Sequence, residues 1–275
     1  MGIIQGAIYG FVTGFTEFLP VPSSAHQFLM LKLFGQNDTV PLLNLCIHMA
    51  LLLAVCYSTR SAIGRLLRDR HVRRRDLRSA KRISASAVGY DLRLIKSAAI
   101  PMAIVMLLCY VLGAKVPWNY LPLFLIINGV VLMIPEHTRQ ANKDARAMSA
   151  IDAILIGLGG ALSVFPGISR NGVILSYAVL RGADKQHATN WALLLSIPAL
   201  VIISAVDIFL VFTSGIGTFS ILVLLSYIAA SAAAFGAGLL GIRFLRFIAP
   251  RLDFSGFAYY SWGIALFGFL LYLIT

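Results

Sequence analysis

Long runs of apolar residues, separated by short polar breaks, extend along almost the whole chain. A transmembrane helix needs about 20 apolar residues in a row, because it must cross about 30 Å of hydrocarbon at about 1.5 Å per residue. Runs of about that length predict membrane-spanning helices at residues 39–57, 97–114, 119–135, 190–213, 220–242 and 255–274. The pattern therefore indicates an all-α integral membrane protein.

A basic stretch after the first predicted span sets the expected orientation. Residues 57–96 hold twelve Lys and Arg against three Asp, a net charge of +9 within a chain total of +12. By the positive-inside rule we expect a cytoplasmic loop here, on the same side as the net basic breaks 136–146, 181–187 and 243–251. Anionic lipid headgroups are expected partners of this loop. It lacks interleaved aromatic residues for base stacking, so nucleic acid is not an expected partner.

Two further apolar regions, residues 2–34 and 150–180, each contain a Gly, Pro and Ser-rich interruption near the middle. For the flanking spans to keep their orientation, each region must begin and end on one side of the membrane. We therefore expect two re-entrant helical hairpins, each followed by three spans, which is an inverted-topology repeat. The single membrane domain 1–275 would consist of a first repeat over 1–135 and a second over 150–275.

Composition agrees with a membrane protein. The chain is 59% hydrophobic and only 12% charged, against about 25% charged residues in a soluble domain, and its mean hydropathy is +0.85. The N-terminal residues lack a basic region and a cleavage site, so no cleavable signal sequence is expected. Three cysteines lie in apolar runs without paired spacing, which favours neither disulfides nor a metal site.

The interruption of the second hairpin, FPGISRNG at 165–172, has the residue types of a phosphate site. Arg170 offers a planar guanidinium fork that matches the geometry of a phosphoryl group. We expect the phosphate-binding donors around it to be Ser169, Asn171 and the backbone at Gly172. The alternative is that Arg170 extends its charged end toward the membrane surface and binds nothing.

The interruption of the first hairpin lies in GFTEFLPVPSSAH at 14–26 and supplies candidate catalytic groups. Glu17 is a candidate base or metal ligand, Ser23 and Ser24 are candidate hydroxyl groups, and His26 is a candidate nucleophile or general acid. Ionisable residues at membrane depth are usually functional, and irregular backbone there must line a cavity or be buried in protein. We therefore expect the two interruptions to meet. The alternative is that the serines cap a helix and His26 makes a structural contact.

The two motifs, with their order and spacing along essentially the whole chain, resemble the undecaprenyl-diphosphate phosphatase family of bacteria. The resemblance implies the inverted-repeat fold and removal of one phosphate from undecaprenyl diphosphate at the outer face of the cytoplasmic membrane, which recycles the lipid carrier of cell-wall synthesis. The family is associated with bacitracin resistance. The resemblance also implies a divalent cation, Mg²⁺ or Ca²⁺, with Glu17 as its ligand. Glu17, Ser23, His26 and Arg170 would be catalytic, and Ser24, Ser169, Asn171 and Gly172 would line the phosphate.

The chain departs from the family motifs at several positions. Thr13 stands where the motif usually has a first acid, and Ile174 stands where it usually has a threonine. Two alternatives therefore accompany the phosphatase hypothesis: a transporter or flippase of polyprenyl phosphate, and a noncatalytic relative that binds the lipid carrier.

Other polar residues within spans have more than one interpretation. His48 could border the cavity or serve packing, and Asp207 could cap or pair structurally. Asn128 is expected to form a helix–helix hydrogen bond, which is the ordinary use of amides in membranes. The oligomeric state and the chain length of the lipid are not indicated.

Overall fold

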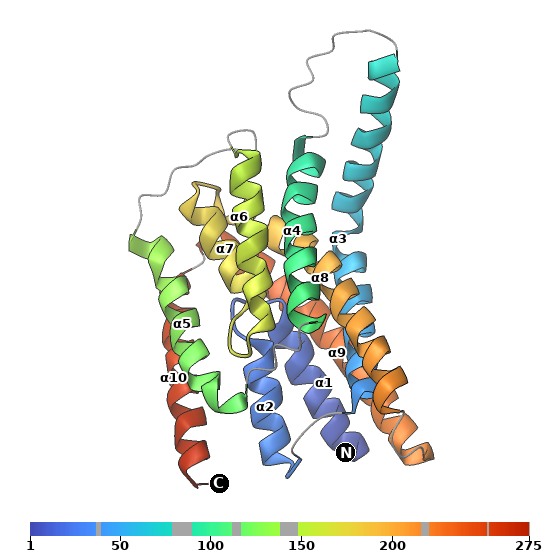
Figure 1. Ribbon diagram of the computed structural model, residues 1–275, viewed down its shortest axis with the longest axis vertical. Helices are drawn as coiled ribbons and strands as arrows, with labels where there is room; N and C mark the ends of the chain where they lie inside the picture. The colour runs from blue at the N-terminus through green and yellow to red at the C-terminus, as the bar shows by residue number, and fades with distance from the viewer. Residues whose placement is uncertain are drawn as a thin grey trace.

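The computed structural model describes residues 1–36, 40–78, 90–111, 117–137, 148–215, 220–251 and 253–274, and in these ranges it is helical with no β-strand (Figure 1). The α-helices are α1 (Ile3–Glu17), α2 (Ser23–Leu33), α3 (Pro41–Arg78), α4 (Tyr90–Val111), α5 (Leu121–Met133), α6 (Ala150–Ala161), α7 (Arg170–Leu180), α8 (Lys185–Ser214), α9 (Ile221–Ile248) and α10 (Phe254–Ile274). Short 3₁₀ turns are η1 (Trp118–Tyr120), η2 (Ile134–His137), η4 (Leu162–Val164) and η5 (Ala249–Arg251).

Within the described residues, four helical segments are long and apolar enough to cross a membrane: Pro41–Arg68, Leu92–Tyr110, Lys185–Ser214 and Ile221–Ile248. They correspond to four of the six predicted spans. The other two predictions, 119–135 and 255–274, fall on the shorter apolar helices Leu121–His137 and Phe254–Leu270. The prediction of an all-α integral membrane protein is confirmed.

The outer surface of the helix bundle is apolar, as lipid requires. Large hydrophobic side chains are exposed on every long helix, among them Leu53, Ile104, Phe212, Ile228 and Leu266. In a lipid environment these side chains contact hydrocarbon, and the polar groups of the chain are directed inward. The polar groups buried inside the bundle are therefore the ones to examine for function.

The predicted loop over residues 57–96 is wrong in its extent. Helix α3 continues through the basic stretch to Arg78, α4 already begins at Tyr90, and residues 79–89 lie outside the described part of the chain. The physical reason is local: after Gly64 the stretch has no Gly or Pro to break a helix, and Arg and Leu are strong helix formers. The extension of α3 projects beyond the other helices at one end of the molecule (Figure 1).

Helices α1 and α2 form one helical hairpin, and α6 and α7 form another. The two hairpins come from opposite ends of the molecule, and their turns face each other near its middle (Figure 1). In the second turn Gly167 has a φ of +97°, a conformation that favours glycine. The turns bring together the two interrupted motifs that the sequence placed about 150 residues apart.

The first helix of each hairpin packs tightly against a long helix of the other half of the chain. A Cβ atom added to Gly10 of α1 would lie 2.0 Å from the carbonyl oxygen of Ala230 in α9. A Cβ atom added to Gly157 of α6 would likewise lie 2.0 Å from the carbonyl oxygen of Ala98 in α4. Small residues thus allow close backbone approach on both sides, as is common between membrane helices.

Candidate functional site

A cavity of about 620 Å³ lies between the turns of the two hairpins and the helices α3, α4 and α8. Its polar wall combines residues from seven helical elements, α1, α2, α3, α4, η4, α7 and α8, and includes both motifs identified from the sequence. The cavity-lining polar residues are Glu17, Ser23, Ser24, Gln27, His48, Cys109, Tyr110, Ser163, Ser169, Arg170 and Asp207.

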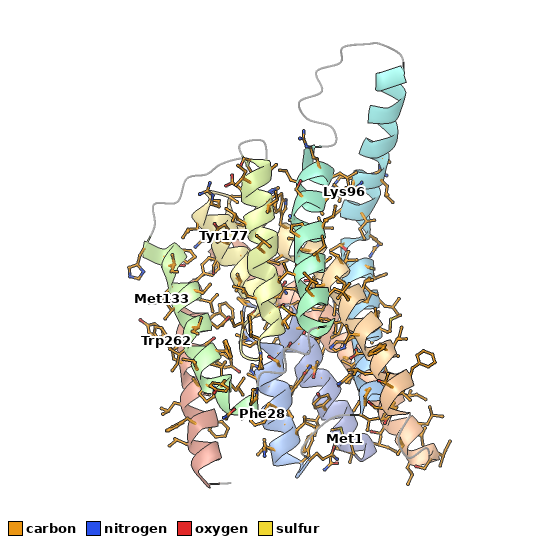
Figure 2. The ribbon with its side chains drawn as sticks, in the orientation of Figure 1. Met1, Phe28, Lys96, Met133, Tyr177 and Trp262 are labelled. Atoms are coloured by element: carbon orange, nitrogen blue, oxygen red, sulfur yellow. The ribbon has the colours of Figure 1, made fainter. Side chains whose placement is uncertain are left out.

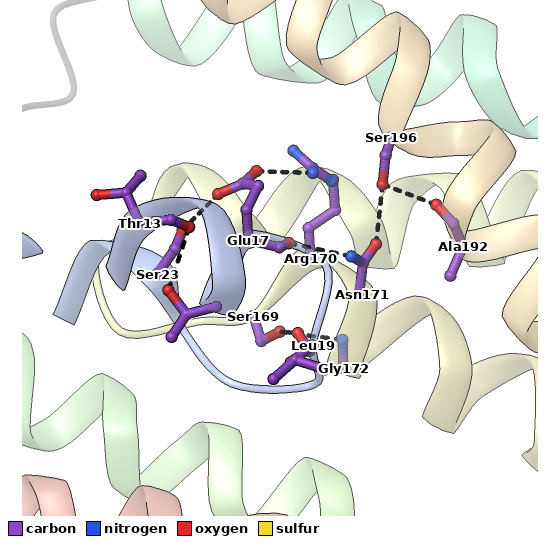
Figure 3. A network of polar contacts seen from close by, with 11 residues as sticks. Thr13, Glu17, Leu19, Ser23, Ser169, Arg170, Asn171, Gly172, Ala192 and Ser196 are labelled. Carbon is purple, nitrogen blue, oxygen red and sulfur yellow. Dashed lines mark hydrogen bonds and ion pairs between the residues drawn. The ribbon is translucent and has the colours of Figure 1, made fainter. Parts of the chain in front are cut away.

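An ion pair in the wall of the cavity joins the two hairpins (Figure 3). Arg170 Nη2 donates to Glu17 Oε1 at 2.8 Å, and the two side chains are only 5% and 8% exposed. Arg170 is the first residue of α7 and Glu17 is the last of α1, so the helix ends themselves position the pair. Arg170 Nε is buried and has no hydrogen-bond partner among the described residues. The guanidinium thus keeps a donor that the protein does not use.

The two serines of the first hairpin make different contacts. Ser23 Oγ donates to Glu17 Oε2 at 2.6 Å, so both carboxylate oxygens of Glu17 are engaged. Ser24 Oγ accepts a hydrogen bond from the Gly167 backbone N–H at 3.1 Å, across the interface between the hairpins. Neither serine caps α2, whose N-terminal capping residue is Pro22 and has no side-chain hydrogen bond. Both hydroxyl groups line the cavity.

Polar residues of the second hairpin mainly hold the structure together. Ser169 Oγ caps α7 by accepting from the Gly172 N–H at 3.1 Å, and it donates to the Leu19 carbonyl at 3.2 Å. Asn171 Nδ2 donates to the Glu17 carbonyl at 3.1 Å, while its Oδ1 accepts from Ser196 at 3.0 Å. Ser169 lines the cavity; Asn171 and Gly172 do not.

His26 lies to one side of this arrangement. Its Nδ1 is 2.8 Å from the Pro22 carbonyl oxygen, and its Nε2 is 2.6 Å from the Tyr260 hydroxyl of α10. Both ring nitrogens are therefore engaged, and His26 is not among the residues that line the cavity. The predicted role of His26 as nucleophile or acid would require this side chain to turn toward the cavity.

Asn128 forms the predicted helix–helix hydrogen bond and also supports the site. Its Nδ2 donates to Ser261 Oγ of α10 at 3.0 Å, and its Oδ1 accepts from the Ser169 backbone N–H at 2.9 Å. The side chain is completely buried. It thus fixes the backbone immediately before Arg170, a function that no local motif around residue 128 indicates.

The cavity also contains a second polar pair. His48 Nδ1 of α3 is 2.6 Å from Asp207 Oδ2 of α8, and the side chains are 15% and 8% exposed. Of the two interpretations of His48, the structure supports the one in which it borders the cavity. Because the two residues are 159 positions apart, nothing in the sequence indicates that they are partners.

The two departures from the family motif lie in the packed interior. Thr13 and Ile174 are both 0% exposed, and neither lines the cavity. Ile174 contacts the backbone of α6 near Gly160 closely enough that an added Cβ there would be 3.0 Å from it. Thr13 Oγ1 has no hydrogen-bond partner in the part of the chain that the structure describes.

The donor groups do not fit a divalent cation held by the protein. Mg²⁺ and Ca²⁺ prefer several oxygen ligands, usually including carboxylates. Glu17 is already bonded through both oxygens to Arg170 and Ser23, and no group of three or more His, Cys, Asp or Glu side chains with metal-binding geometry occurs within the described ranges. The described side chains of the cavity therefore do not form a cation site of their own.

Comparisons with known proteins agree with the arrangement of the motifs. The family model described as "Bacitracin resistance protein BacA" matches residues 6–267. A protein of Carboxydothermus hydrogenoformans is 27% identical over 95% of this chain and 94% of its own length. One of Methanobrevibacter smithii is 29% identical over 98% of both chains, and one of Desulfosudis oleivorans is 33% identical over 75% of this chain and 78% of its own. All three are named undecaprenyl-diphosphatase.

Proposed function

The chain belongs to the bacitracin resistance protein BacA family, and from this we propose that it is an undecaprenyl-diphosphatase. It would hydrolyse undecaprenyl diphosphate to the monophosphate and inorganic phosphate. The relatives that bear this name match the chain over most of its length, which supports the same reaction here. The product is the form of the lipid that carries cell-wall precursors.

The observation that carries this proposal is a buried arginine at the meeting point of the two hairpins. Arg170 lines a cavity of about 620 Å³, large enough for a diphosphate group, and its buried Nε has no hydrogen-bond partner among the described residues. A buried guanidinium stabilises charge that develops on a phosphoryl group more strongly than one in water would. Arg170 would bind the diphosphate and stabilise the transition state of phosphoryl transfer.

Of the two candidate nucleophiles, Ser23 contacts Glu17, the ion-pair partner of Arg170, whereas His26 is turned toward Tyr260. The Ser23 hydroxyl donates to Glu17, so its oxygen lone pairs remain available in the cavity. Activation of Ser23 as a nucleophile would require Glu17 to accept a proton, which would break its ion pair with Arg170 and leave a buried charge uncompensated. We therefore assign Ser23 and Ser24 to positioning the phosphate and the attacking water.

The fold is proposed to be an inverted repeat, in which residues 1–135 and 150–275 each form a re-entrant hairpin followed by three helices. The packing supports it. Helix α1 packs on α9 as α6 packs on α4, α3 packs on α8, and α5 packs on α10. Gly10 and Gly157 occupy corresponding places in this scheme, each against a backbone carbonyl.

The cavity is proposed to open to the outer face of the cytoplasmic membrane. The basic extension of α3 and Lys96 lie at one end of the molecule, whereas Met1 lies at the other (Figure 2). The basic end is assigned to the cytoplasm. His48, Tyr110 and Leu210 line the cavity from the parts of α3, α4 and α8 that are farthest from that end.

Cysteine labelling tests this orientation. Single cysteines are introduced in place of Arg65 or Asn119 in a background without the three native cysteines. An impermeant reagent should label a cysteine at 65 only from the cytoplasm and a cysteine at 119 only from outside. Arg65 and Asn119 are both exposed, so access is not limited by burial. Reversed labelling of either position would overturn the proposed orientation.

The reaction itself is tested by phosphate release from undecaprenyl diphosphate by the purified protein in detergent, with chelator, Mg²⁺ or Ca²⁺. Stoichiometric release of phosphate and undecaprenyl phosphate is expected. A requirement for cation would mean that the cation arrives with the diphosphate. No release under any condition, together with movement of labelled lipid phosphate across proteoliposomes, would replace the phosphatase with a flippase.

A further inference from the structure

The His48–Asp207 pair lies in the same cavity as the Glu17–Arg170 pair but belongs to different helices, α3 and α8. The hairpins are joined by the Glu17–Arg170 ion pair and the hydrogen bond between Ser24 and Gly167. The His48–Asp207 pair is therefore not needed to hold them together. Polar pairs inside a membrane protein are costly to bury, and those that border a cavity are candidates for function. The pair thus needs an explanation beyond packing.

The geometry of the pair fixes the state of the histidine ring. A carboxylate can only accept hydrogen bonds, so the short contact between Asp207 Oδ2 and His48 Nδ1 places the ring proton on Nδ1. In a neutral ring the lone pair is then on Nε2, for which no hydrogen bond to another described residue is found. A carboxylate that holds a histidine in this tautomer is the arrangement used to prepare a general base.

The other acid and histidine near the site are less suited to accept a proton. Glu17 is bonded through both oxygens, one of them to Arg170. His26 has both nitrogens engaged and is not part of the cavity wall. Hydrolysis nevertheless requires that the attacking water lose a proton, so a base must face the phosphate.

Resting on the proposed function, we propose that His48 is the general base of the hydrolysis and that Asp207 is its positioning residue. The water oxygen forms a bond to the terminal phosphorus as its proton passes to His48 Nε2. The bond between that phosphorus and the bridging oxygen breaks, and its electron pair leaves on undecaprenyl monophosphate. Arg170 stabilises the charge on the phosphoryl oxygens, and His48 then loses the proton to water.

Several ionisable groups share this part of the molecule with His48. Asp207 contacts it from α8, and Cys109 and Tyr110 of α4 line the same cavity. Glu17 and Arg170 are the charged groups contributed by the hairpins. Helix α9 also packs on α3, and its Tyr227 interacts electrostatically with Cys46 of α3.

The test compares two substitutions of His48, each of which places an amide group near one of the two ring nitrogens. His48→Asn retains a donor near Nδ1 for Asp207, and His48→Gln retains an amide near Nε2, but neither can accept the proton. Both are expected to lower kcat by about 100-fold or more with KM changed by less than about threefold. The control is His137→Asn, the same substitution at an exposed histidine of η2, which should leave both constants unchanged.

Asp207→Asn tests the positioning role. An amide at 207 can donate to Nδ1 and thereby move the ring proton to Nε2, where it blocks proton acceptance. We expect a loss of kcat, and the double variant with His48→Asn should lose no more than His48→Asn alone. The loss should fall on kcat, with KM changed by less than about threefold, which a general structural defect would not produce.

The outcomes separate this inference from the proposed function. If the wild-type protein releases phosphate and His48→Asn retains kcat within about threefold, the general-base assignment is wrong while the phosphatase stands. If losses at 48 and 207 multiply, the two residues act separately and the pair is structural. Variants that are monodisperse in detergent and still bind undecaprenyl diphosphate, yet do not turn it over, support the proposal. Absence of release by the wild-type protein rejects the proposed function itself.

Discussion

The α1–α2 hairpin and the α6–α7 hairpin share a backbone plan but use their polar side chains differently. Each packs its first helix through a glycine, Gly10 or Gly157, against a backbone carbonyl of another helix. In the first hairpin α2 begins without a side-chain cap, which leaves the hydroxyl groups of Ser23 and Ser24 for other contacts. In the second, Ser169 caps α7 and Asn171 links two other elements.

This difference separates the residues that can meet a substrate from those that hold the cavity in shape. The first hairpin contributes hydroxyl and carboxylate groups to the cavity wall. The second contributes Arg170, Ser163 and Ser169 to the wall, but Ser169 and Asn171 use their side chains for hydrogen bonds within the protein. The two motifs therefore have different roles. Substitutions in the first hairpin should mainly lower activity, whereas those in the second, apart from Arg170, should mainly lower stability.

Arg170 is the exception in the second hairpin, and its loss is expected to have the largest effect. Arg170→Ala and Arg170→Lys should both reduce kcat/KM for undecaprenyl diphosphate by about 100-fold or more, because an ammonium cannot reproduce a planar fork of donors. Steady-state phosphate release measures this. Near-normal turnover with lysine would mean that residue 170 supplies only positive charge.

Ser23→Ala and Ser169→Ala should separate the two hairpins at an intermediate level. Ser23→Ala is expected to lower kcat by about tenfold with little change in thermal stability, since its hydroxyl faces the cavity. Ser169→Ala should instead cost about 0.5–2 kcal/mol of stability through loss of the helix cap and leave the Gly172 N–H unpaired. Thermal unfolding in detergent and steady-state kinetics on the same samples show whether each variant loses stability or turnover. The same profile for both variants would remove the distinction drawn between the hairpins.

Ser24→Ala should have the smallest effect. Its hydroxyl accepts one hydrogen bond from the Gly167 N–H across the hairpin interface, and such a bond contributes about 0.5–1.5 kcal/mol. We expect a small decrease in the apparent Tm and a change in kcat/KM of less than about tenfold. A loss comparable to that of Ser23→Ala would show that the Ser24 hydroxyl contributes as much as that of Ser23 to positioning the phosphate.

Much of the architecture follows from the sequence, because hydropathy and charge bias directly reflect the membrane. The helical class, the four long spans and the meeting of the two motifs at Glu17 and Arg170 could be predicted in this way. The end of α3 could not, because a hydropathy pattern locates where a helix leaves the hydrocarbon and not where the helix stops. Arg78 is still helical although residue 57 was the predicted end of the span.

The division of tasks within the motifs could not be predicted either. Whether a hydroxyl faces a cavity or caps a helix depends on the rotation of the turn, which a pattern of residue types does not specify. Thus Asn171 was predicted to line the phosphate but links Glu17 and Ser196, and the partner of His48 comes from a helix 159 residues away. Such pairings are set by the tertiary packing of α3 on α8.

The length of α3 gives a depth scale for the molecule. At about 1.5 Å per residue, Pro41 and Arg60 are about 28 Å apart along the helix, close to the hydrocarbon thickness of about 30 Å. Arg60, stacked on the ring of Tyr57, would then mark the inner boundary of the bilayer. In the proposed orientation, Pro41 would mark the outer boundary, and His48 lies about 10 Å from Pro41 along the helix. The diphosphate would therefore have to sink about 10 Å below the outer boundary and give up much of its hydration before it reaches the reactive groups, while its isoprenoid tail remains in the lipid.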